Sequence, residues 1–157
     1  MKKLVVYYSF GGNTRAVAKK IARALDADIA EIRTTKTYPD DYDVLLGIAK
    51  REVETDCIPP IYALPADAQA YDTIILGTPV WWYSYAPAVK TFMKGIKWGG
   101  KKVYPFATHH GKLGHTPSDL RKALRGAAVA PVFSVVFQEK QQVTPEHELN
   151  AWISSIQ

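Results

Sequence analysis

The chain has 157 residues, the size of one domain, and no run in it approaches the ~20 apolar residues of a membrane-spanning helix. Its formal net charge of +5 comes from Lys and Arg side chains that are scattered along the chain, which argues against a nucleic-acid-binding arm. The single cysteine, Cys57, excludes an internal disulfide and suits a reducing compartment. We therefore expect one soluble, cytoplasmic domain over residues 1–157.

The N-terminal third alternates strand and helix patterns. Residues 3–8 (KLVVYY) form a continuous apolar run that ends at two glycines, as expected for a strand that is buried on both faces. Residues 14–25 carry apolar side chains four apart on one stripe, which predicts a helix. A weaker strand pattern follows at 26–33.

A second helix pattern lies in residues 38–55. Asp40 or Asp41 supplies its N-cap, and its apolar residues recur at helical intervals, at Tyr42, Leu46, Ala49 and Val53. Three prolines interrupt residues 57–71, which predicts an irregular connection there.

The second half continues the alternation with three strand patterns, at residues 72–80, 101–108 and 130–137. Pro105 removes a backbone donor from the middle one and counts against a regular central position for it. A helix pattern follows each strand: one starts at Pro87, one has Thr116 as N-cap, and one repeats the Thr-Pro opening within 144–156.

Five strands that alternate with helices predict a doubly wound α/β domain, with a parallel sheet and helices on both faces. In the strand order 2-1-3-4-5, ligands bind at the carboxyl ends of the strands, between strands one and three. This order brings together the loops "SFGGNTR" and "TPVWWYSYAP".

The first loop has the composition of a phosphate cradle. Gly11 and Gly12 allow close backbone approach, Ser9 and Thr14 supply hydroxyls, and the following helix directs free N–H groups at the same point. The loop lacks the Lys-Ser/Thr ending of a Walker motif and is not GxGxxG, so a monophosphate suits it better. A tight turn in which Asn13 or Ser9 caps the helix is the equal alternative.

Three consecutive aromatic residues, Trp81, Trp82 and Tyr83, occupy the second loop, where exposed aromatic area requires a reason. A flat aromatic ligand is one reason, and cover for the sheet edge or a protein-binding patch is another. The third loop, "THHGKLGHT", holds His109, His110 and His115, but no acidic ligand and no HExxH spacing, so we expect no metal site.

Together these three motifs resemble, in the same order, those of the flavodoxin-like family, small single-domain proteins that bind FMN. The resemblance covers nearly the whole chain and implies a non-covalent FMN that carries the electrons, with no catalytic side chain. It implies the cofactor-binding residues Ser9, Gly11, Gly12, Asn13, Thr14, Arg15, Thr78, Pro79, Val80, Trp81, Trp82, Tyr83, Thr108, His109, His110, Gly111 and Gly114.

Two departures from the family pattern bear on the site. Gly11 stands where the family often has a threonine, which removes one phosphate hydroxyl. His109, His110 and Lys112 stand in a loop that the family often builds from small residues. We expect a histidine or Lys112 near the flavin to favour its anionic reduced form and to raise its two-electron potential.

Three functions fit the sequence. The first is an electron carrier that exchanges electrons with a redox partner protein or a small acceptor, and a homodimer is one form that the protein can take. The second is an NAD(P)H-dependent reductase of quinones or similar acceptors, although no second nucleotide fingerprint is present. The third is a non-redox module that recognises another phosphate ligand or a protein.

Overall fold

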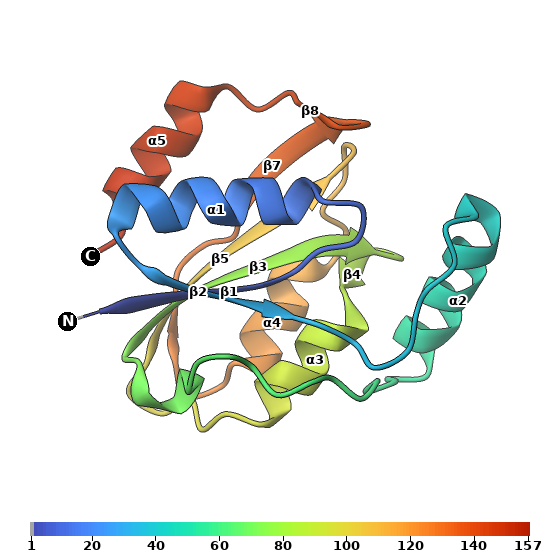
Figure 1. Cartoon of the computed structure of the whole chain (residues 1–157), viewed down its shortest axis with the longest axis horizontal. Coiled ribbons are helices and arrows are strands. Elements are labelled where there is room, and N and C mark those ends of the chain that lie inside the picture. The colour runs from blue at the N-terminus through green and yellow to red at the C-terminus, as the bar shows by residue number, and fades with distance from the viewer. Residues whose placement is uncertain (1) are drawn as a thin grey trace.

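The computed structural model describes residues 2–157 and contains a sheet whose five long strands are all parallel to their neighbours (Figure 1). Their spatial order is β2-β1-β3-β5-β7. This order confirms the predicted doubly wound α/β class and the topology 2-1-3-4-5. The strands are β1 (Lys3–Tyr8), β2 (Asp28–Ile32), β3 (Thr73–Trp81), β5 (Lys102–His109) and β7 (Phe133–Gln138).

Three strands of two residues each bring the sheet to eight strands, and the sequence patterns predict none of them because two residues show no periodicity. β4 (Ser84–Tyr85) runs antiparallel to β3, and β8 (Gln141–Gln142) runs antiparallel to β7. Both fold back at the carboxyl ends of their partners and so shape the loops there. β6 (Ala128–Val129) pairs with the start of β5.

The expectation that Pro105 counts against a central position for the fourth long strand is wrong. β5 is an interior strand, between β3 and β7, and Pro105 lies opposite Leu76 of β3. On its other side, β6 pairs with residues 102–103 and β7 with residues 106–109, so the ladder is interrupted at residues 104–105. A proline has no N–H to donate, and this interruption tolerates its absence.

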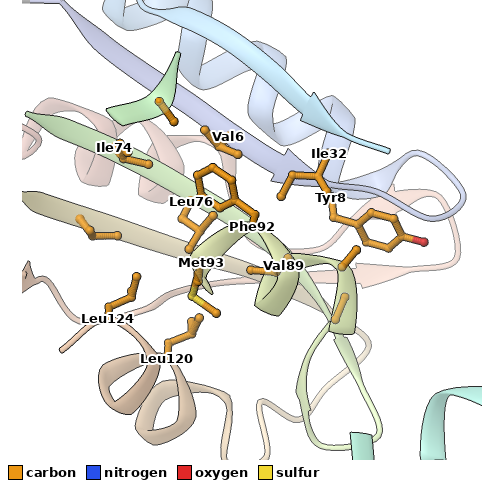
Figure 2. Packing of buried hydrophobic residues seen from close by; sticks show 14 of the residues in the cluster. Val6, Tyr8, Ile32, Ile74, Leu76, Val89, Phe92, Met93, Leu120 and Leu124 are labelled. Atoms are coloured by element: carbon orange, nitrogen blue, oxygen red, sulfur yellow. The ribbon is translucent and has the colours of Figure 1, made fainter. Parts of the chain in front are cut away.

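Two layers of helices cover the sheet (Figure 1). α1 (Asn13–Leu25) and α5 (Glu146–Ser154) pack on one face, in a core that includes Val5, Ile21 and Leu149. α3 (Pro87–Lys94) and α4 (Thr116–Ala123) pack on the other. Figure 2 shows that second core, in which the labelled side chains of β1, β2, β3, α3 and the α4 region converge. The apolar stripes of the four helices therefore face the sheet and cover both of its faces.

α4 begins one residue earlier than expected. Thr116 is its first residue and His115 is the N-cap, so Thr116 is not the cap. The Thr116 hydroxyl donates to the carbonyl oxygen of Leu113 at 2.6 Å.

α2 (Tyr42–Glu54) stands away from the body of the molecule, beyond the carboxyl ends of the strands (Figure 1). Its predicted N-cap is confirmed, because Asp41 accepts a hydrogen bond from the Val44 N–H at 3.0 Å. The side chains of Tyr42 and Leu46 remain exposed. The stripe predicted from the sequence thus exists, but much of it does not enter the core.

The connection from α2 to β3 is irregular, as predicted, apart from one 3-10 turn, η1 (Ala68–Ala70). Within residues 2–157, none of the helices is both long and apolar enough to cross a membrane.

Candidate functional site

A cleft of about 620 Å³ opens at the carboxyl ends of β1, β3 and β5, and α2 forms its outer wall. Among the sequence-predicted residues, those that line it are Asn13, Pro79, Val80, Trp81, Trp82, Thr108, His109, His110 and Gly111. The other predicted residues lie in the same three loops, behind or beside the lining. The topology therefore brings the three motifs to one place.

The first loop ends in a glycine turn, Gly11–Gly12, that leads into α1. Both glycines have positive φ, 81° and 102°, and Gly12 is the N-cap without a side-chain capping bond. Ser9 accepts from the Arg15 N–H at 3.1 Å. Among residues 2–157, the N–H groups of Gly12, Asn13 and Thr14 have no acceptor of ordinary hydrogen-bond geometry. These donors at a helix N-terminus are suited to an anion.

The side chain of Thr14, the second residue of α1, turns inward. The Thr14 and Thr108 hydroxyls lie 2.8 Å apart, and both residues are buried. Thr14 therefore joins the glycine turn to β5 with its hydroxyl and leaves its N–H free. Because either hydroxyl can be the donor in this pair, the contact predicted between the Thr14 hydroxyl and a phosphate stays a prediction, and the Thr14 N–H is a further donor.

Arg15 points to β2. Its guanidinium donates to Glu31 at 2.6 Å, and the Tyr7 hydroxyl donates to the same carboxylate at 3.1 Å. This hydrogen bond from Arg15 is also the largest cause of the raised pKa of Arg15. The carboxylate neutralises much of the charge that Arg15 would bring to an anion at the glycine turn.

The second loop is a two-residue hairpin turn of Trp82 and Tyr83, between the paired residues Trp81 and Ser84. Both turn residues have positive φ, 45° and 68°. Such turns favour Asn-Gly, because a side chain at positive φ is strained. Two bulky aromatic residues in this conformation indicate a functional constraint.

Trp82 and Tyr83 have different surroundings. Trp82 lines the cleft, and the Lys50 ammonium of α2 lies 5.2 Å from its ring centroid. Tyr83 is half-exposed outside the cleft, and its ring centroid lies 5.2 Å from that of Trp82. Trp82 is thus the aromatic residue of this turn that is placed to contact a ligand.

Trp81 is a core residue with one edge at the cleft. It is 8% exposed, and its ring packs edge-to-face against Tyr8, Phe10 and Tyr38 at centroid distances of 5.7, 6.0 and 5.0 Å. Burial raises the pKa of both tyrosines, with a hydrogen bond to Glu52 adding to it at Tyr38. This aromatic cluster anchors the second loop to β1 and supports the cleft from below.

Thr78 is fully buried at the start of this loop. Its hydroxyl donates to the carbonyl oxygen of Pro79 at 2.8 Å and accepts from the Ala86 N–H at 3.0 Å. The Thr78 hydroxyl therefore joins the backbone at the two ends of the second loop and stabilises its conformation.

The histidines of the third loop have different hydrogen-bond partners. His109 Nδ1 accepts from the Gly111 N–H at 3.0 Å, and its Nε2 is hydrogen-bonded to Ser134. Burial lowers the pKa of His109, with a smaller contribution from the charge of His110. His110 Nδ1 is hydrogen-bonded to the Phe137 carbonyl at 2.9 Å, and the His110 and Lys112 side chains both line the cleft.

The remaining histidine of the loop, His115, pairs with Asp119 of α4. Gly114 is required beside it, because a Cβ there would lie 2.4 Å from the Tyr83 carbonyl oxygen. Within the described part of the chain, no group of three His, Cys, Asp or Glu side chains is placed to hold a metal ion.

Sequence reasoning missed the outer wall of the cleft. It consists of Phe10, of Asp40 just before α2, and of the α2 residues Tyr42, Leu45, Leu46 and Ala49. The apolar stripe of α2 is the signal for most of them, but a stripe does not reveal whether a core or a ligand covers it.

A second cleft, of about 520 Å³, lies between α2, α3 and α4. Its three carboxylates are already bound within the chain. Asp56 pairs with Lys90 at 2.7 Å, Asp119 accepts from Ser84 at 2.6 Å, and Glu52 accepts from Tyr38 at 2.7 Å. None of the residues predicted from the sequence lines this cleft.

Comparison with known proteins agrees with the geometry. A family model described as Flavodoxin matches residues 2–156. A flavoprotein of Lactobacillus acidophilus, solved in complex with FMN, is 25% identical, with a TM-score of 0.75 over 96% of this chain and 97% of that one. An archaeal flavodoxin is 19% identical, with a TM-score of 0.61 over 98% and 92% of the chains, which shows the fold alone.

An NAD(P)H dehydrogenase (quinone) of Gluconacetobacter diazotrophicus is 34% identical over 124 residues. The alignment covers 70% of this chain and 59% of that protein. The family model matches almost every residue of the chain, and the fold gathers the three loop motifs around one cleft. This chain therefore belongs to the flavodoxin family.

Proposed function

We propose that this protein binds FMN non-covalently in the 620 Å³ cleft and transfers electrons through it. The observation that carries the proposal is the placement of the unpaired α1 amides beside an apolar, aromatic cleft. A ligand that joins a phosphate to a flat ring system satisfies both halves. The FMN complex of the Lactobacillus acidophilus relative supports the same cofactor.

The residues present fit FMN at both ends. The N–H groups of Gly12, Asn13 and Thr14 would hold the phosphate, which needs donors and a positive helix dipole. Trp82, Pro79 and Val80 would contact the ring from one side and the His109–Lys112 segment from the other, excluding water. When bound, FMN supplies the redox chemistry, and the chain tunes it through contacts and charge.

An electron carrier with a redox partner protein is the function we favour. Electron transfer through a bound flavin requires no acid, base or nucleophile from the chain, which agrees with the absence of a catalytic side chain in the sequence prediction. A cytoplasmic location accords with the lone thiol of Cys57.

A reductase that takes hydride from NAD(P)H and reduces quinones is the second candidate. The 34% identity to the Gluconacetobacter enzyme favours it, as does the apolar α2 wall, where Tyr42 and Leu46 could contact a flat acceptor. The chain spans less than two thirds of that enzyme, so the activity is a proposal for this chain.

The deciding experiment has two stages. Purified protein is titrated with FMN and, in parallel, with riboflavin, and quenching of flavin fluorescence is measured. Saturable binding of FMN that is much tighter than binding of riboflavin supports the phosphate and ring sites together. Failure to bind either flavin would refute the redox function and leave a non-redox module.

The loaded protein is then mixed with NADH or NADPH, with and without a quinone. Oxidation of the nicotinamide, followed at 340 nm, would establish the reductase. Inertness towards both nucleotides, with reduction by a flavodoxin reductase protein, would establish the carrier.

A further inference from the structure

The hairpin that joins β7 to β8 lies against the glycine turn, although more than 120 residues separate them in sequence. The Asn13 side-chain amide donates to the Glu139 carbonyl oxygen at 2.8 Å, and the Lys140 ammonium donates to the Gly11 carbonyl oxygen. Figure 1 shows the hairpin tip on the same side of the molecule as the loop that precedes α1. A basic side chain thus reaches the predicted phosphate cradle from outside the three loop motifs.

The backbone of Lys140 is held in a tight turn. Glu139 and Lys140 form a two-residue turn between the paired Gln138 and Gln141, and Glu139 has a φ of 56°. The far side of the hairpin is tied to α1, because Lys20 donates to Gln142 at 3.2 Å and to Glu146 at 3.0 Å. The hairpin is therefore held to α1 at two points, its tip by Asn13 at the start of the helix and β8 by Lys20 two turns along it.

Gly11 lies against the end of this lysine side chain. A Cβ at position 11 would lie 3.2 Å from Lys140 Nζ, tighter than most such contacts. Lys140 Nζ therefore lies next to the point where a side chain at position 11 would begin.

Among the basic residues near the glycine turn, Lys140 keeps its charge uncompensated. Arg15 is paired with Glu31 and Lys20 with Glu146, whereas Lys140 has no carboxylate within 4.0 Å among residues 2–157. Its present partner is a neutral carbonyl, which does not cancel the charge. An ammonium has three donors, so others remain for an anion.

We propose that Lys140 is a further phosphate-binding residue, which holds the terminal phosphate of FMN together with the α1 amides and makes the site selective for FMN over riboflavin. This inference rests on the proposed function. It identifies the β7–β8 hairpin as a source of cationic charge at the phosphate end of the site, where Arg15 is paired with Glu31.

The test compares the dissociation constants of FMN and riboflavin, by fluorescence quenching, for the wild type, Lys140→Gln, Lys140→Arg and the control Lys19→Gln. Lys19 is exposed on α1, so Lys19→Gln removes one positive charge from the helix that follows the glycine turn. We expect Lys140→Gln to weaken FMN roughly tenfold, because it removes a hydrogen bond to a charged group, and to leave riboflavin within about twofold. Lys140→Arg should restore most of the affinity, and Lys19→Gln should match the wild type.

Salt supplies a second readout. Raising the ionic strength should weaken FMN binding to the wild type more than to Lys140→Gln, because screening acts on the charge that the variant lacks. Equal FMN affinity in Lys140→Gln and wild type would overturn the inference while the proposed function stands. Equal losses for both flavins would also overturn it, since they would assign Lys140 a structural role. If the wild type binds neither flavin, the inference and the proposed function are both refuted.

Discussion

The backbone carbonyl oxygen of Tyr83 accepts a hydrogen bond from the His115 N–H at 2.8 Å, which fastens the aromatic turn to the loop that precedes α4. Gly114 lies at this contact with a φ of 61°. The two loops that flank the cleft are thus held together through backbone atoms.

We expect Gly114→Ala to be strongly destabilising. The new Cβ would lie 2.4 Å from the Tyr83 carbonyl oxygen at an unfavourable φ, so the turn must move. The free energy of unfolding in urea should fall by about 2–4 kcal/mol. Gly99→Ala is the matched control, since nothing lies within 4 Å of its Cβ position, and it should change stability by less than ~0.5 kcal/mol. Equal effects of the two substitutions would contradict this account.

The aromatic turn should show a trade-off between stability and binding. Replacing Trp82 and Tyr83 by Asn and Gly supplies the sequence that a two-residue turn with two positive φ angles favours. We expect the double variant to gain about 1 kcal/mol of stability, since relief of backbone strain exceeds the loss of the Trp82–Tyr83 contact.

The same variant should bind FMN roughly tenfold more weakly, because stacking on an aromatic ring contributes ~1–3 kcal/mol. Thermal melts and fluorescence titrations measure the two effects. A variant that is less stable than the wild type would show that the turn is not strained.

His109 should make stability depend on pH. Its pKa is lowered in the folded protein, first by burial and then by the charge of His110. Its Nδ1 accepts a hydrogen bond from Gly111, so a proton on that atom would face another donor. Below pH ~6.5 the unfolded chain binds a proton that the folded chain resists, so the free energy of unfolding falls as the pH is lowered.

His109→Asn keeps an acceptor near Gly111 and removes the titration. We expect melting temperatures measured between pH 7.5 and 5.5 to decline less in this variant than in the wild type. His147→Asn, at an exposed position of α5, should decline as the wild type does. An unchanged slope in His109→Asn would assign the pH dependence to other groups.

Lys112 and His110 should set the potential of bound FMN. Both line the cleft, and a positive charge favours the anionic reduced flavin. Lys112→Gln should lower the two-electron midpoint potential by roughly 10–30 mV, where 30 mV corresponds to about 1.4 kcal/mol. Potentiometric titration with reference dyes measures this potential, and a potential that is unchanged in both Lys112→Gln and His110→Gln would exclude a role for this loop in tuning.

The sequence predicts the fold well because its signals are periodic. The buried run at residues 3–8 and the four-residue spacing of Val17, Ile21 and Leu25 each specify one element and one buried face. The topology then follows from the alternation of strands and helices. Pro105 misled the prediction because the interruption of the ladder beside it depends on where β6 ends and β7 begins, which no local pattern reveals.

The site is predictable only in part, for a related reason. The loops after β1, β3 and β5 carry unusual residues and could be identified, whereas Lys140 lies in an ordinary polar turn. Arg15 and Thr14 have the right chemistry for a phosphate, but their side chains are bound to Glu31 and Thr108, respectively. Such pairings join residues 16 and 94 positions apart, and only the folded chain brings them together.

The contact between Lys140 and Gly11 also sets the order in which the cleft can be completed during synthesis. The glycine turn is made before the hairpin, because Gly11 precedes Lys140 by 129 positions. A ribosome-bound chain that ends before β7 would have the turn and the aromatic loop, but not the lysine or the last long strand of the sheet. We therefore expect stable acquisition of a phosphorylated ligand to follow translation of the hairpin.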